Sequence, residues 1–131
     1  MLTPRQLLIL VMMGVVFWAV ATAQIRWVPA SITDSVTGAL TFVTSLPAGW
    51  LSVWITRRWA SLTQVQLPAG ILISGATAMM IDGVLLHWAP QVYGEADATV
   101  RLGAAWLLWG YGIAFGIAYL MSRPGVSRAA R

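Results

Sequence analysis

The sequence predicts an all-α protein, an antiparallel bundle of four transmembrane helices with both termini in the cytoplasm. Three observations carry this prediction. The 131 residues are 59% hydrophobic and only 9% charged, whereas about a quarter of the residues of a soluble domain are charged. The apolar residues form four stretches, each near the ~20 residues that a helix needs to cross hydrocarbon. The arginines gather at alternate ends of these stretches, and a single domain, 1–131, is expected at this length.

Helices are the only regular structure that fits the four stretches. None of them alternates as a barrel strand does, and a barrel needs many more segments. The connections are short, so sequential spans should run antiparallel. The predicted spans cover approximately residues 6–25, 35–55, 67–88 and 100–121.

The first span follows Arg5 and contains no acidic residue. An alternative interpretation is a secretory signal, because the run Leu7–Val20 is followed by Ala21-Thr22-Ala23, which has the form of a cleavage site. The apolar run continues to Ile25, and the charge pattern of the chain fits four spans. Both facts favour a retained helix.

The second span contains Pro47 near its middle. A proline inside a helix removes one backbone hydrogen bond and usually kinks the helix. Hydroxyls such as those of Thr44 and Ser45, just before it, can satisfy freed carbonyls. The sequence therefore predicts a kink at Pro47, a feature of transporters and of purely structural spans alike.

The third span carries the most informative residue, Asp82, which is the only acidic residue in any span. An ionised carboxylate in hydrocarbon costs at least ~2.5 kcal/mol on insertion scales, so it needs a partner, a water path or a proton. At ~1.5 Å per residue it lies ~22 Å along the helix, past the membrane midplane. Arg26 and Arg101 flank the outer ends of the neighbouring spans, and either could reach inward to pair with it.

Small residues mark the surfaces where helices should pack. Ser74, Ala78 and Asp82 are spaced four apart, with Gly75 and Gly83 on a neighbouring stripe, so Asp82 should face another helix. The fourth span contains Gly112 and Gly116, a G-x-x-x-G pair that lets backbones approach closely in lipid. Packing inside the bundle is the favoured interpretation of that pair, and packing against a second protomer is the alternative.

The arginines predict the orientation. Arg5, Arg57, Arg58, Arg123, Arg128 and Arg131 would share one side, and only Arg26 and Arg101 the other. Because basic residues near span ends stay in the cytoplasm, both termini should be cytoplasmic and the bacterial inner membrane is the expected location. Sparse cations at span ends do not make a nucleic-acid surface.

Few residues suggest chemistry. There is no cysteine, nucleophile–histidine–acid arrangement, P-loop or dinucleotide fingerprint, so an enzyme is not expected. His87 is the only histidine, and it lies about 140° around the helix from Asp82. It is at most a weak metal or haem candidate, requiring ligands from another subunit, and no cofactor or metal is expected.

Several segments together resemble an uncharacterised bacterial family of small four-span membrane proteins. The resemblance rests on Met13–Thr22, Ile81–Leu86, Ala89–Tyr93 and Gly103–Gly112. It implies that Asp82, Pro90 and Trp109–Gly112 belong to a shared pattern, but it brings no catalytic or binding residues with it. The chain is also similar in size to small multidrug-resistance exporters, but these carry a glutamate in their first span, where this chain has no acid.

The sequence is compatible with two functions. The favoured one is an accessory, assembly or scaffold component that contacts the lipid bilayer and other membrane subunits or a homodimer partner. The alternative is a small proton- or cation-coupled transporter that uses Asp82. A transporter should show a water-accessible cavity that reaches the carboxylate, whereas an accessory protein should show it sealed.

Overall fold

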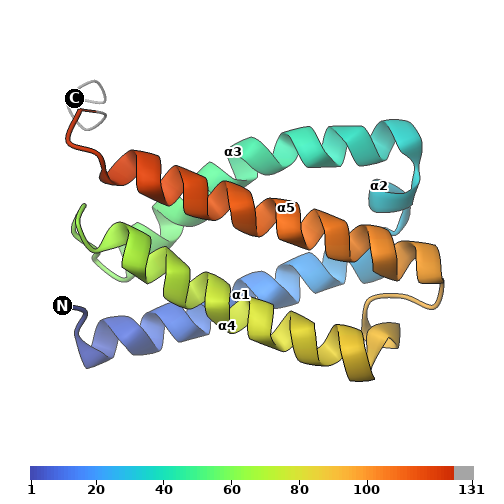
Figure 1. Ribbon diagram of the computed structural model, residues 1–131, viewed down its shortest axis with the longest axis horizontal. Helices are drawn as coiled ribbons and strands as arrows, with labels where there is room; N and C mark the ends of the chain where they lie inside the picture. Colours follow the sequence, from blue (N-terminus) through green and yellow to red (C-terminus); the bar gives the residue numbers. More distant parts are fainter. Residues whose placement is uncertain (126–131) are drawn as a thin grey trace.

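The computed structural model describes residues 1–125, and this part of the chain is all-helical without strands (Figure 1). Four helices are long and apolar enough to cross a membrane, which confirms the predicted fold class. They are α1 (Pro4–Trp27), α3 (Ser35–Trp59), α4 (Leu67–Trp88) and α5 (Asp97–Ser122). Arg128 and Arg131, two of the six arginines that predict the orientation, lie outside the described residues.

Two short elements lie where the sequence predicted only connections. The helix α2 (Ala30–Thr33) separates α1 from α3, and the 3-10 turn η1 (Pro90–Val92) follows α4. Both lie at one end of the bundle, here called the distal end. The opposite end, called the terminal end, holds the start of α1, the α3–α4 turn and the end of α5 (Figure 1).

Local side-chain chemistry explains where two helices begin. Thr3 and Gln6 form a reciprocal capping box and Pro4 occupies the first turn, so α1 starts slightly before its apolar run. The Asp34 carboxylate accepts the Thr37 N–H at 2.9 Å and caps α3. That backbone hydrogen bond lowers the pKa of Asp34.

The helices pair unevenly. The most extensive packing joins α1 to α4, followed by α3 on α5 and α4 on α5, whereas α1 and α3 hardly meet. At the terminal end, Leu10, Val53 and Ile71 belong to one core cluster that joins α1, α3 and α4. At the distal end, a second cluster is formed by Ile25, Ile32, Tyr93 and Leu107. The two clusters close the bundle at its ends.

Glutamine side chains bind free helix-end carbonyls at the terminal end. Gln6 Nε2 donates to the carbonyls of Ala60 and Ser61 at 3.1 and 3.3 Å. Gln64 Nε2 donates to the carbonyls of Met121 and Arg123 at 3.3 and 3.0 Å. The last carbonyls of a helix lack partners within the helix, so these amides satisfy groups that would otherwise need water.

The helix α3 changes direction partway along its length (Figure 1), and Pro47 lies inside it. Two indoles of α5 bind α3 just before that proline. Trp106 Nε1 donates to Ser45 Oγ at 2.9 Å, and Trp109 Nε1 donates to the Phe42 carbonyl at 2.9 Å. The Thr44 and Ser45 hydroxyls both donate to the Thr41 carbonyl.

Candidate functional site

Asp82 lies on the inward face of α4, and only 4% of its surface is exposed. Ala78 and Ser74, one and two turns before it, are buried on the same stripe. The Ser74 hydroxyl donates to the Leu10 carbonyl of α1 at 2.8 Å. The carboxylate therefore continues a stripe that packs against other helices.

Two tyrosine hydroxyls donate hydrogen bonds to the two carboxylate oxygens of Asp82. Tyr93 donates to Oδ1 and Tyr111, from α5, donates to Oδ2. Trp18, from α1, donates from Nε1 to the Tyr93 hydroxyl at 3.2 Å. These four side chains, here called the Asp82 cluster, join α1, α4, α5 and the connection between α4 and α5. Hydrogen bonds of this kind are what a buried carboxylate requires.

The connection between α4 and α5 is folded so that Tyr93 points inward. Pro90 opens η1 with its fixed φ, and the Tyr93 N–H donates to the Pro90 carbonyl at 3.0 Å. This turn buries the Tyr93 side chain completely, within the distal core cluster. A loop residue is thereby fixed inside the bundle, where its hydroxyl reaches Asp82.

Neither predicted arginine meets Asp82. Arg26 Nη1 donates to the Gln91 carbonyl at 2.7 Å and pairs with Glu95 at 3.1 Å. This is the only ion pair within residues 1–125, and Arg101 is exposed on α5. The expected arginine partner is thus replaced by two tyrosines. The physical reason is that a guanidinium is cheaper to keep at the distal surface than to draw into hydrocarbon.

The remaining predicted residues fall into two groups. A Cβ added at Gly75 would lie 2.5 Å from the Phe115 ring, so Gly75 marks a close contact between α4 and α5. A Cβ added at Gly83, Gly112 or Gly116 would meet nothing within 4 Å. These three glycines therefore face away from the bundle, and the favoured placement of the G-x-x-x-G pair inside it is wrong.

His87 is exposed and packs edge-on against Trp88, with ring centroids 4.4 Å apart. Within residues 1–125 no group of three or more histidine, cysteine, aspartate or glutamate side chains is placed to hold a metal ion. The position of His87 is that of a surface aromatic near the distal end of α4.

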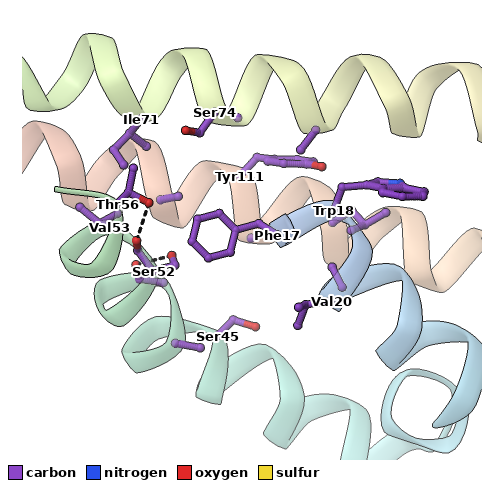
Figure 2. Close-up of a pocket in the computed structure, with 18 of the residues that line it drawn as sticks. Phe17, Trp18, Val20, Ser45, Ser52, Val53, Thr56, Ile71, Ser74 and Tyr111 are labelled. Atoms are coloured by element: carbon purple, nitrogen blue, oxygen red, sulfur yellow. Dashed lines mark hydrogen bonds between the residues drawn. The ribbon is translucent and has the colours of Figure 1, made fainter. Parts of the chain in front are cut away.

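A crevice of about 370 Å³ lies beside the Asp82 cluster, where α1 and α3 separate (Figure 2). Its lining comes from all four long helices and includes Phe17, Ser45, Ser52, Thr56 and Tyr111. Trp18 also lines it, but Asp82 does not. Tyr111 thus stands between the crevice and the carboxylate, to which its hydroxyl donates.

Sequence reasoning missed Tyr93 and Tyr111 as partners of Asp82, and Trp18 as the donor to Tyr93. Tyr93 and Tyr111 fall in two of the segments that carry the family resemblance, and Trp18 falls in a third. The resemblance singles out these three segments, but it does not show that their side chains contact one another. The usable signal was chemical, since a buried carboxylate without a cation needs hydroxyl or N–H donors.

The fold and the Asp82 cluster define a class, a multi-pass membrane protein built as a four-helix bundle. Protein-family profiles, curated proteins and solved structures all give no match to this chain. The resemblance to an uncharacterised bacterial family therefore stays a prediction.

Tyr93 should make the fold sensitive to alkaline pH. Burial, and then the hydrogen bond to Asp82, raise the pKa of Tyr93 above its ordinary value of 10.0. The folded state then holds a proton that the unfolded state loses. The contribution of Tyr93 to the free energy of unfolding is therefore full below about pH 10 and falls as pH rises further. We expect thermal unfolding in detergent between pH 8 and 11 to show this loss, and Tyr93→Phe to lose less than wild type.

The matched control for this titration is Tyr119→Phe, because Tyr119 is exposed on α5 and does not contact Asp82. This variant should keep the wild-type dependence on pH. Equal slopes for wild type and Tyr93→Phe would contradict the role given to the buried hydroxyl.

Proposed function

We propose that this chain is a non-enzymatic component of the bacterial inner membrane, with both termini in the cytoplasm, that serves as an accessory, assembly or scaffold subunit of a larger complex. One observation carries the proposal. Both oxygens of the only carboxylate within a span accept tyrosine hydroxyls, and the side chain is 4% exposed. A carboxylate held in this way is a structural contact between helices.

The outward faces of the bundle support an interaction role. Gly112 and Gly116 leave a strip of α5 backbone without a side chain above it. Such strips allow close approach of another helix in lipid, whether from a different subunit or a second copy. The bundle interior does not use this strip, so it is available to a partner.

Gentle solubilisation from the native membrane tests the proposal. We expect the tagged chain to migrate on native gels well above its own 14.2 kDa and to bring defined membrane proteins with it. Gly116→Leu should weaken this association while leaving the bundle folded, because its side chain would project outward. Migration as an isolated chain, unchanged by Gly116→Leu, would argue against an accessory role.

A proton- or cation-coupled transporter is the second candidate, and one observation favours it. Tyr111 lines the crevice and also donates to Asp82, so one hydroxyl separates the crevice from the carboxylate. Purified protein in vesicles loaded with a pH-sensitive dye distinguishes the two functions. The accessory role predicts no proton flux that depends on Asp82. Flux lost in Asp82→Asn, with normal insertion, would establish the transporter.

A further inference from the structure

The crevice between α1 and α3 is closed along the bundle axis and open at its side. Val53 and Ile71 line it and also belong to the core cluster at the terminal end. At the distal end, α2 lies against α3 and α5 and its Ile32 joins Ile25 of α1 in the other cluster. A ligand would enter this space most directly from the bilayer, through the gap between α1 and α3.

The hydroxyls in the crevice wall are already satisfied. Ser52 and Thr56 donate to carbonyls of their own helix at 2.8 Å, and Ser74 donates to α1. Ser45 donates to the Thr41 carbonyl and accepts from Trp106. Figure 2 shows the Phe17 ring in the middle of this space, between α3 and α4. The wall is therefore effectively apolar despite its serines and threonines.

Gln24 is the exception. Its side chain lines the crevice near the distal end of α1 and makes no hydrogen bond within residues 1–125. An amide at the edge of hydrocarbon is costly without a partner. The crevice thus offers an apolar channel with one free hydrogen-bonding group at its distal end.

The size of the crevice decides which occupant fits. A crevice of about 370 Å³ does not enclose a membrane-spanning helix about 30 Å long and 10 Å wide. The observed volume lies within the ~300–1,000 Å³ range of small-molecule sites. An aliphatic chain fits, with a carbonyl positioned to accept a hydrogen bond from the amide of Gln24.

We propose that this crevice holds one acyl chain of a membrane phospholipid, with an ester carbonyl of that lipid accepting a hydrogen bond from Gln24. The occupant is a phospholipid because the crevice opens sideways to the bilayer and Gln24 lies within one helical turn of the end of α1, where ester groups are found. This inference is independent of the role of Asp82.

Native mass spectrometry of purified, detergent-washed protein tests it. We expect wild type to retain one phospholipid per chain and Ala48→Phe, which fills the crevice from α3, to lower that occupancy at least tenfold. The matched control is Ala105→Phe, because Ala105 is exposed on α5 and does not line the crevice. Equal retention by all three proteins would overturn the proposal.

A second measurement does not depend on the folding of a variant. Wild-type protein in vesicles that contain a phospholipid with a diazirine on its acyl chain is irradiated, and the labelled peptides are mapped. We expect labels concentrated at 17–24 and 45–56, and weakened there by Gln24→Leu. Labels spread evenly over the exposed faces of α1 and α5, or bound quinone in place of phospholipid, would contradict the assigned occupant.

Discussion

Replacing Asp82 by alanine is expected to lower the free energy of unfolding in detergent by about 2–6 kcal/mol. The reason lies in the hydroxyls that remain, because Tyr93 and Tyr111 both donate to this carboxylate. A buried donor that loses its acceptor costs ~1–3 kcal/mol. Chemical unfolding followed by the loss of helical circular dichroism measures the change.

Comparison variants distinguish the loss of the Asp82 cluster from the loss of any carboxylate. Glu95→Gln removes a carboxylate whose side chain is 80% exposed and should change the unfolding free energy little. Asp82→Asn keeps one acceptor oxygen and should fall between wild type and alanine. In a double-mutant cycle, Asp82→Ala and Tyr111→Phe together should destabilise less than the sum of the two single changes. Additive effects would contradict the hydrogen bond between them.

Gly14→Leu is expected to separate α1 from α4 and to cost about 3 kcal/mol. A Cβ at this position would lie 2.5 Å from the Ser74 carbonyl oxygen and 2.9 Å from the Thr77 Cβ. Neither atom is the end of a flexible side chain, so the helices themselves must move. The hydrogen bond from Ser74 to the Leu10 carbonyl would be lost with them. Thermal unfolding in detergent provides the measurement.

Gly116→Leu provides the matched control, since the same change on α5 meets no atom within 4 Å. The isolated chain should keep its wild-type unfolding temperature. A loss as large as that of Gly14→Leu would show that the strip of α5 around Gly116 packs within a single chain, contrary to the arrangement described above.

The sequence was sufficient for the architecture because hydrocarbon imposes it. In an apolar run of about 20 residues, only a helix lets the backbone N–H and C=O groups bond each other without water. The helix α4 accordingly begins and ends at the predicted residues. Thr3 and Asp34 cap α1 and α3 and so determine where these helices begin. The hydrophobic pattern predicts such starts only approximately. The short helix α2 depends on the packing of Ile32 in the distal core cluster. No local sequence feature predicts that packing.

The candidate site was predicted in part. Burial of Asp82 followed from its position in α4, but the other members of its cluster did not, because Trp18, Tyr93 and Tyr111 come from three separate segments. Arg26 looked suitable on charge, yet Glu95 and the Gln91 carbonyl were closer to the end of α1. The outward placement of Gly112 depends on which face of α5 meets α3, and that face is set by the indoles of Trp106 and Trp109.

The uneven pairing of the helices has a consequence for biosynthesis. The main partner of α1 is α4, whose last residue is synthesised about 60 residues after α1 ends, a delay of roughly 3–12 s at ~5–20 residues per second. Throughout that interval the surface around Gly14 has no matching helix, and α3 packs chiefly on α5, which comes last. The first two spans therefore leave the ribosome as unmatched helices. Insertion machinery that shelters them until α4 and α5 emerge would determine the yield of folded protein.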